Sequence, residues 1–539
     1  MSSIEELLRR LDAAKSDTLL QAAIAAESVL LARPETERQP LRAALDAAAV
    51  LRWFDVSLLG KLLEVPDEEA RTRFEALASV PFVERYRMRD TDLRNIHEAT
   101  RLGWRKKLAD ETPAHFHSLS VRAAEGFADD PTPAGRIEWI YHLLSGDPDL
   151  GATELEKLNR DWSSSARPQE RNALAAALRE IEETGLVASR ARAWILLVIA
   201  WARVERGETT QLGGTAAKAL QLARAAEDRP AEAEAQCPLG NLRQAQGNLE
   251  EAQAALGEYL SISRRLAEQD PSNAGWQREL AVAHSRVGDV LQAQGKLEGA
   301  QAAFGEYLTI SRRLSEQDPS NAGWQRDLAV AHSRVGDVLQ AQGKLEAAQA
   351  AFDQHLTISR RLSEQDPSNA GWQRELAVAH SRVGGVLQAQ GKLNAAQAAF
   401  GEYLTISRRL AEQDPSNAGW QRDLAVAHSR VGDVLQTQGK LEAAQAAFGE
   451  SLGIARRLAE HDPSNAGWQR ELALACLRFA GLEANANRHD AALPLYEEAS
   501  RIFAALSERA PGFVQWAEDR AIVEAELALY RSRLARTRS

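Results

Sequence analysis

The stretch Asn273–Asp318 decides the fold of this chain because it recurs. It begins Asn-Ala-Gly-Trp-Gln-Arg-Glu-Leu and ends Arg-Arg-Leu-Ser-Glu-Gln-Asp. Its tryptophan returns at a constant interval of 48 residues (324 − 276 = 48), at Trp276, Trp324, Trp372, Trp420, Trp468 and Trp516. A period of this size indicates stacked structural units, each of which completes the core of its neighbour.

One repeat predicts a pair of helices. Apolar residues follow one another at steps of three and four from Trp276 to Leu291, which places them on one face of a helix. Gln294-Gly295-Lys296 interrupts this pattern, and Gly295 suits the left-handed backbone found at helix ends. A second helical pattern runs from Leu297 to Leu314. Either Asp270 or Asn273 can cap the first helix, and the sequence leaves that choice open.

The repeat resembles the tetratricopeptide repeat, through Val287-Gly288, Leu291, Ala300, Phe304 and Tyr307. Gly288 has a physical role, because a residue without a side chain lets the two helices approach. The repeat departs from the family in carrying His284 at a bulky position and in having 48 rather than 34 residues, so each helix needs about 20 residues or ~30 Å. The resemblance covers residues 231–513. It implies an all-α, right-handed solenoid, and the lengthened unit is similar to repeats of large bacterial signalling proteins.

Residues 38–118 differ from the repeats in their sequence pattern. We expect helices over Leu41–Leu51, Val56–Leu63 and Asp67–Leu77, with Asp67 as a cap. A strand or hairpin over Val80–Met88 and a helix over Asn95–Leu108 would follow. This order, with Leu51-Arg52-Trp53-Phe54-Asp55, Phe82-Val83-Glu84 and Ile96-His97-Glu98-Ala99, resembles the winged-helix module of bacterial STAND-type regulators. The resemblance implies a regulatory wedge.

The sequence therefore predicts five segments, an all-α solenoid behind a small winged-helix-like domain. They are N-terminal helices over 1–37, a winged-helix-like domain over 38–118, a helical region with degenerate repeats over 119–230, tandem repeats over 231–513, and a C-terminal capping helix over 514–539. A STAND-type protein also carries a phosphate-binding loop. The nearest string, Gly288–Leu297, has the wrong glycine spacing and lacks Ser or Thr after Lys296, so no nucleotide cofactor is predicted.

Charge bears on the choice between a protein partner and DNA. The net charge of −11 and a pI near 5.7 argue against broad nucleic-acid binding. On the third predicted helix, Arg71 and Arg73 are offset by neighbouring glutamates, whereas a DNA-reading helix carries an uncompensated basic face. The cations that would carry the alternative, a winged-helix transcription regulator with a sensing solenoid, are Arg85, Arg87, Arg89, Arg94, Arg101, Arg105, Lys106 and Lys107.

No catalytic residue and no metal site are predicted. Four histidines recur at the repeat spacing, at His284, His332, His380 and His428, but no second ligand type accompanies them, so we interpret them as half-buried structural residues. Cys237 and Cys476 form no metal or redox motif, which fits a reducing, cytoplasmic setting. No apolar run is long enough to cross a bilayer, and Trp194–Trp201 is interpreted as a buried helix.

The predicted binding surface lies on the first helices, which line the concave face in the family that the repeats resemble. Its residues point away from the apolar stripe and recur with the repeat, as Ser285, Asp289, Gln292; Ser333, Asp337, Gln340; Ser381, Gln388; and Ser429, Asp433, Gln436. Gly385 interrupts the aspartates. Such a groove would favour a partner with backbone amides and basic side chains. There are two alternatives to a partner-binding surface. These positions form a solvated helix face, or the repeats act as a spacer whose length varies freely.

These observations predict a non-enzymatic adaptor or sensor in bacterial signalling or defence. It would bind a protein or peptide partner, with no nucleic acid and no membrane. The sequence does not determine the oligomeric state.

Overall fold

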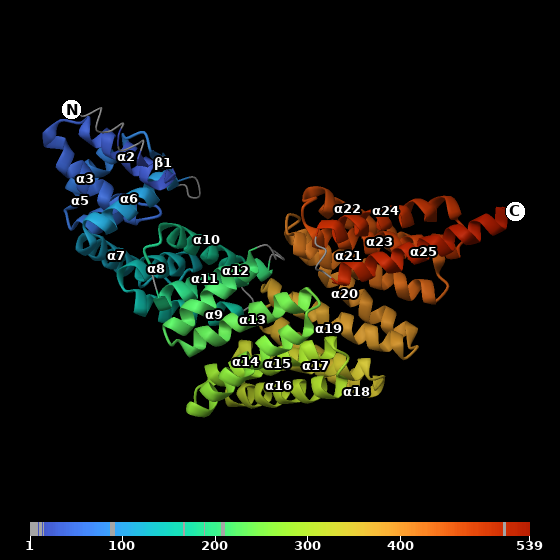
Figure 1. Cartoon of the computed structure of the whole chain (residues 1–539). Coiled ribbons are helices and arrows are strands. Elements are labelled where there is room, and N and C mark those ends of the chain that lie inside the picture. The colour runs from blue at the N-terminus through green and yellow to red at the C-terminus, as the bar shows by residue number, and fades with distance from the viewer. Residues whose placement is uncertain are drawn as a thin grey trace. The chain divides into compact units, whose positions relative to one another are not determined.

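The computed structural model describes residues 9, 13–14, 16–86, 92–164, 168–187, 189–205, 211–509 and 514–538. The chain divides into two compact units, one formed by residues 1–163 and 167–235 and the other by residues 164–166 and 236–539. Both are built almost entirely from helices (Figure 1). The second unit contains the tandem repeats.

Each repeat of the second unit folds as two antiparallel-paired helices joined by a short turn, and successive pairs stack (Figure 1). The helices are α13 (Arg229–Ala245, which spans the unit boundary), α14 (Leu249–Gln269), α15 (Ala274–Ala293), α16 (Leu297–Gln317), α17 (Ala322–Ala341), α18 (Leu345–Gln365), α19 (Ala370–Ala389), α20 (Leu393–Gln413), α21 (Ala418–Thr437), α22 (Leu441–His461), α23 (Ala466–Asn485), α24 (His489–Arg509) and α25 (Val514–Arg538). The predicted helix pair is therefore present in every repeat, and the C-terminal helix expected over 514–539 corresponds to α25.

The structure resolves which residue caps the first helix. The Asn273 side chain accepts a hydrogen bond of 3.1 Å from the Trp276 amide, and the asparagine of each later repeat does the same. Asp270 instead accepts a 3.0 Å hydrogen bond from the Ser272 amide and holds the preceding turn. Asn273 is thus the cap, and Asp270 shapes the approach to it.

Two glycines recur in the repeats between residues 231 and 461, and both have the roles expected of them. Gly295 has φ of 73°, in the left-handed region, and ends the first helix. Gly288 faces the Phe304 ring so closely that an added Cβ would lie 2.5 Å from a ring carbon. Gly336 meets Phe352 at the same distance one repeat later. The close packing of the two helices therefore depends on these positions.

We expect Gly336→Ala to destabilise the solenoid although alanine favours helices. Overpacking against Phe352 costs about 1–3 kcal/mol, and the helix-propensity gain of about 1 kcal/mol offsets only part of it. The net loss of about 1 kcal/mol would appear as a lower urea midpoint. The matched control is Gly305→Ala on α16, where an added Cβ meets nothing within 4 Å and only the gain applies. Equal midpoints for the two variants would contradict the packing role.

The Trp-Gln-Arg signature also has a structural explanation. Gln277 is buried, and its amide donates a hydrogen bond of 3.1 Å to the Ala267 carbonyl of the preceding helix. Its side-chain oxygen accepts from Arg313 of the following helix. The glutamines of the later repeats donate to the same place in the preceding second helix. This residue therefore joins three successive helices.

The first unit contains a small domain followed by further helices. Its elements are α2 (Thr18–Leu31), α3 (Glu35–Val50), α4 (Val56–Leu63), α5 (Asp67–Ala78), β1 (Val83–Arg85), β2 (Arg94–Ile96), α6 (Glu98–Glu111), α7 (Pro113–Phe127), α8 (Pro133–Gly146), α9 (Pro148–Ser164), α10 (Pro168–Thr184), α11 (Ser189–Glu205) and α12 (Leu212–Ala225). β1 pairs antiparallel with β2, in the register Val83↔Ile96, and Phe54 forms a bridge with Arg94.

Several boundaries in this unit differ from the expectation. Residues 94–96 form β2 rather than the start of a helix, because Arg94 pairs with both Arg85 and Phe54. Asp67 is the first residue of α5 and not its cap, which is Pro66, so no side chain caps that helix. Most of the residues before Asp17 in the predicted N-terminal helical segment lie outside the described residues, as does Met88. The helix around Trp194 is buried as expected and belongs to the core of α8–α11.

Candidate partner-binding surface

The first helices α15, α17, α19, α21 and α23 contact one another in sequence order along the second unit. We define the first-helix face as the surface that carries Ser285, Asp289 and Gln292 of α15 together with their equivalents on the later first helices. The repeat spacing therefore produces a row of like residues across neighbouring helices.

The aspartates of the first-helix face are not free carboxylates. Each forms an ion pair with an arginine of the next repeat, and we call these pairs the Asp–Arg row. They are Asp289–Arg334 at 3.4 Å, Asp337–Arg382 at 3.0 Å and Asp433–Arg478 at 3.9 Å. Arg286 also lies 3.8 Å from Asp289 within its own helix. Because the arginines neutralise these carboxylates, the face is less acidic than the sequence suggested.

Burial shapes the electrostatics of the Asp–Arg row. It raises the pKa of Asp337, and Arg382 and Arg334 oppose that rise. The pKa of Asp289 and of Asp433 is raised for the same reason, again against the neighbouring arginines. These carboxylates are therefore held between helices, where they couple one repeat to the next.

A second set of ion pairs joins the same helices through the Trp-Gln-Arg signature, and we call it the signature ladder. Its rungs connect residues 49 apart, and they include Arg326–Glu375 at 3.0 Å and Arg422–Glu471 at 2.6 Å. The other rungs are Arg278–Asp327, Arg374–Asp423 and Arg470–Asp519. The arginines of both sets were not among the residues predicted from the sequence. Their recurrence at the repeat spacing was the available signal.

The structure distributes the remaining predicted residues between buried and accessible positions. Ser285, Ser333 and Ser429 are buried, and Ser429 accepts a hydrogen bond from Arg478. Ser381, with the glutamines Gln292, Gln340, Gln388 and Gln436, is only partly buried. The glutamines are thus the most available of the predicted groups, together with Ser381.

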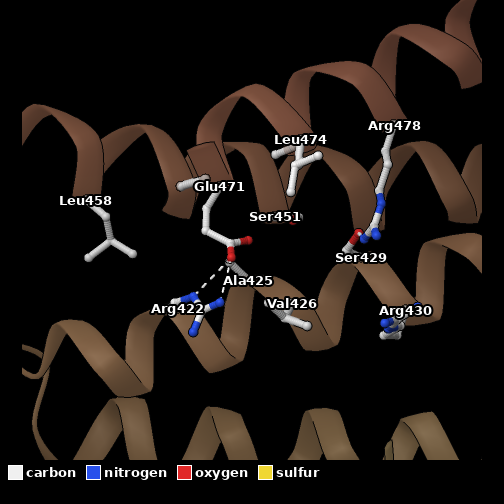
Figure 2. Close-up of a pocket in the computed structure, with 12 residues that line it drawn as sticks. Arg422, Ala425, Val426, Ser429, Arg430, Ser451, Leu458, Glu471, Leu474 and Arg478 are labelled. Carbon is white, nitrogen blue, oxygen red and sulfur yellow. Dashed lines mark hydrogen bonds and ion pairs between the residues drawn. The ribbon is translucent and has the colours of Figure 1, made fainter. Parts of the chain in front are cut away.

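Two open pockets lie on the first-helix face. One, of about 230 Å³, is bordered by Arg422, Ser429, Arg430, Glu471 and Arg478, and Figure 2 shows Arg422 turned toward Glu471 across it. The other, of about 490 Å³, brings together the predicted residues Gln340, Ser381 and Gln388 around Gly385. Tyr403, Asp423, two valines and three arginines complete its lining.

The recurring histidines occupy positions consistent with a packing role. His284, His332 and His380 are half-buried, and His428 is buried. Burial lowers their pKa, to about 4 in the case of His332. Among the described residues no group of three or more His, Cys, Asp or Glu side chains could hold a metal ion. Cys237 and Cys476 are both buried, and they do not form a disulfide.

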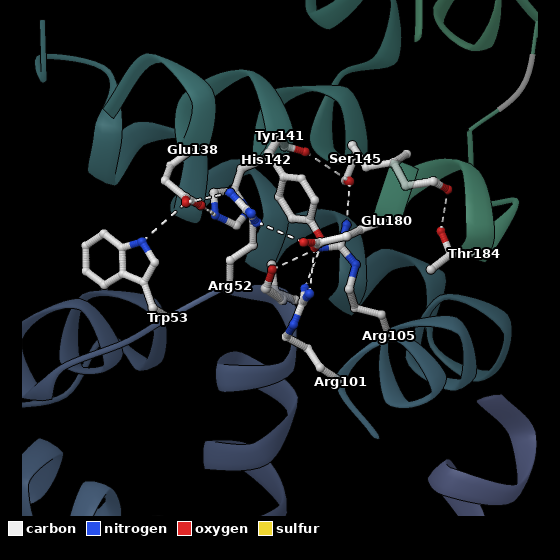
Figure 3. Close-up of polar contacts among 12 residues, drawn as sticks. Arg52, Trp53, Arg101, Arg105, Glu138, Tyr141, His142, Ser145, Glu180 and Thr184 are labelled. Atoms are coloured by element: carbon white, nitrogen blue, oxygen red, sulfur yellow. Dashed lines mark hydrogen bonds and ion pairs between the residues drawn. The ribbon is translucent and has the colours of Figure 1, made fainter. Parts of the chain in front are cut away.

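The cations proposed for DNA binding are largely engaged inside the first unit. Arg101 is 4% and Arg105 1% exposed. Figure 3 shows both in a polar cluster with Arg52, Glu138, Tyr141 and Glu180. Arg94, Lys106 and Lys107 form ion pairs with Asp92, Asp17 and Glu27. Arg85 is exposed, and Arg87 and Arg89 lie outside the described residues. The basic face required for reading DNA is therefore much smaller than the sequence allowed.

Over the part of the chain that the structure describes, no helix combines the length and apolarity needed to cross a membrane.

Comparison with known proteins gives structural matches only. No family model and no curated protein matches the chain. A signal transduction ATPase with numerous domains (STAND) and a tetratricopeptide repeat sensor, from Pyrococcus horikoshii, superposes with a TM-score of 0.51 at 12% identity, over 97% of this chain and 72% of that one. A Rap protein complexed with competence and sporulation factor matches with a TM-score of 0.46 at 14% identity, over 76% and 99%. BtubC from P. vanneervenii matches with a TM-score of 0.38 at 20% identity, over 48% and 92%.

At these identities the comparisons show the fold alone. Together with the repeated helix pairs, they establish that this chain is an all-α protein whose repeats form a tetratricopeptide-like α-solenoid.

Proposed function

We propose that this chain is a non-enzymatic adaptor or sensor that binds a protein or peptide partner on the first-helix face, the concave face of the solenoid, in bacterial signalling or defence. A tetratricopeptide-like solenoid is a protein-interaction architecture. The repeats of the Pyrococcus protein are described as its sensor, which supports the same role here.

One observation carries the proposal: the accessible groups of the first-helix face recur from helix to helix and meet in an open pocket. Gln340, Ser381 and Gln388 come from two successive first helices and border one space. Amide and hydroxyl groups can both donate and accept hydrogen bonds, which matches the alternating donors and acceptors of an extended backbone. The Asp–Arg row and the signature ladder hold these helices in register, so the groups are positioned before a partner arrives.

For the first unit we propose a winged-helix-like regulatory module over residues 38–118. The order α3, α4, α5 and then the β1–β2 hairpin supports this proposal. The burial of Arg101 and Arg105 favours a packing role over the alternative of DNA reading.

The experiment is affinity capture with matched variants of the full chain. Gln340→Arg, Gln388→Arg and Gln436→Arg together place three bulky cations on the first-helix face. We expect at least a tenfold loss of the captured partner, because each arginine fills accessible space and removes a hydrogen-bonding amide. The control carries Thr309→Arg, Thr357→Arg and Thr405→Arg, three exposed positions on second helices with the same added charge. Equal capture by both variants would refute the assignment of the face.

A further inference from the structure

The Asp–Arg row is broken once, and the break leaves one arginine without its carboxylate. The pairs Asp289–Arg334, Asp337–Arg382 and Asp433–Arg478 each join residues 45 apart. By the same spacing Arg430 should pair with residue 385, which is Gly385. Among the described residues Arg430 forms no ion pair within 4.0 Å, and no dashed line reaches it in Figure 2.

The missing side chain also opens the larger pocket. Gly385 has nothing within 4 Å of the position where its Cβ would lie. The pocket of about 490 Å³ is bordered by Gly385 and by Arg382, Arg422 and Arg430. In three other repeats an aspartate occupies the position of Gly385 and turns toward the arginine of the next repeat. The pocket therefore lies where the aspartate carboxylate lies in those repeats.

The charge balance of this pocket favours an anion. Arg382 pairs with Asp337, Arg422 pairs with Glu471, and Asp423 of the lining pairs with Arg374. These six residues cancel one another, and Asp433, which interacts with Arg430 along the same helix, already pairs with Arg478, so one positive charge remains in surplus at Arg430. An arginine offers a planar set of N–H donors that matches the geometry of a carboxylate.

We propose that this pocket binds a carboxylate of an extended peptide partner, which replaces the missing aspartate opposite Arg430. The proposal rests on the proposed function, because it places one anchoring contact on the first-helix face. Gln340, Ser381 and Gln388 lie around the same space and can hydrogen-bond the peptide backbone beside the carboxylate. A single surplus arginine selects one acidic group rather than an acidic run.

The repeats themselves supply the decisive substitution. Gly385→Asp would restore the residue found at three equivalent positions, so its carboxylate would pair with Arg430 and fill the pocket. The fold should tolerate this substitution, because the same Asp–Arg pair is already present in the repeats on both sides. Gly449→Asp on α22 is the matched control: an added Cβ there meets nothing within 4 Å, and the equivalent position of an earlier repeat is Asp353.

The probes are fluorescent pools of ten-residue peptides with one fixed central residue, Glu, Gln or phosphoserine, each with an amidated C-terminus, and a fourth pool with fixed Gln and a free C-terminal carboxylate. Binding to the full-length protein is followed by fluorescence anisotropy. We expect the Glu pool to bind at least about tenfold more tightly than the amidated Gln pool, the loss typical of a charge-assisted hydrogen bond. Gly385→Asp and Arg430→Gln should abolish that preference, and Gly449→Asp should keep it.

Each other outcome overturns a defined part of the inference. Equal binding of the Glu and amidated Gln pools by the wild type, unchanged in Gly385→Asp, would refute the carboxylate pocket and leave the binding face standing. A preference confined to the free C-terminus would retain the carboxylate but assign it to the end of the peptide. Tighter binding of phosphoserine than of Glu would show that the anion is a phosphate and overturn the proposal. No binding of any pool would overturn both the pocket and the peptide-binding face.

Discussion

Glu180→Gln is expected to destabilise the first unit by about 3–5 kcal/mol, the usual cost of removing one partner from a buried ion-pair network. Glu180 accepts a 2.6 Å hydrogen bond from Arg101 and a 3.3 Å hydrogen bond from Arg52. Glutamine keeps the shape of the side chain but not its charge. Two arginines would then lose the carboxylate that they share, and Arg101 is almost completely buried.

The network around Glu180 joins segments that are far apart in sequence (Figure 3). Arg101 of α6 also donates a 2.9 Å hydrogen bond to the Tyr141 hydroxyl on α8, and Arg52 pairs with Glu138 at 3.0 Å. Although burial favours the neutral acid, Arg101 and Arg52 hold the pKa of Glu180 below its usual value. A carboxyl whose pKa is lowered by folding stabilises the fold at pH values above its pKa in the unfolded chain. This contribution should therefore decline as the pH falls below about 4.3, the pKa of an unperturbed glutamate.

The measurement is urea unfolding of the full chain, with hydrogen exchange of peptides from α6, α8 and α10 to isolate the first unit. Glu183→Gln is the control, because Glu183 lies on the same helix and is exposed. We expect the control to change stability by less than about 0.5 kcal/mol. Faster exchange in both variants, or in neither, would show that the network does not hold these helices together.

The repeats could be predicted from sequence because the relevant signal is local and is presented several times. Steps of three and four between Trp276 and Leu291 define a helix, and Gly295 defines its end. The position of Gly288 against Phe304 likewise follows from helix pairing. Each repeat provides independent support for the same prediction, and the structure contains the helix pair at every one.

The first unit was harder to predict because its decisive contacts are long-range and occur once. Arg101 and Glu180 are 79 residues apart, and no periodicity relates them. The sequence therefore allowed Arg101 and Arg105 to be read as surface cations, although they are buried. β2 is three residues long, and its pairing with β1 is also not a local property.

The binding surface lies between these cases. The aspartates of the first-helix face were found from their spacing, and whether they contact a partner stays a prediction. Their arginine partners recur just as regularly, but pairing Asp337 with Arg382 requires the offset between neighbouring first helices, which the sequence does not specify. The pocket at Gly385 also depends on this offset, because the offset is what places Gly385 opposite Arg430.

The second large effect is expected from pH, through His355. This histidine stands where the neighbouring repeats carry Tyr307 and Tyr403, is 1% exposed, and has no hydrogen-bond partner at either ring nitrogen. Burial lowers its pKa to about 4; Glu375 opposes this shift, whereas Arg382 and His332 add to it.

Between pH 6.5 and pH 4 the unfolded chain binds a proton at His355 that the folded chain does not, so acidification removes stability. From pH 7.5 to pH 5 the loss is about 2 kcal/mol, at 1.36 kcal/mol for each pH unit below the unfolded pKa of about 6.5.

His355→Tyr should remove this component and keep the packing, because the repeat already accommodates tyrosine there. The Tyr403 hydroxyl donates a 3.2 Å hydrogen bond to the Asp423 carbonyl, and the equivalent acceptor for residue 355 is the carbonyl of Glu375. Hydrogen exchange in α18 reports the free energy of opening of that helix. We expect acidification to lower this free energy by about 2 kcal/mol less in the variant than in the wild type. The reciprocal change Tyr307→His should create the same sensitivity one repeat earlier, since its site is also buried. All other histidines are common to the three proteins and cancel in the comparison. If the pH dependence of hydrogen exchange is the same in both variants as in the wild type, protonation of these sites does not lower the stability of the fold.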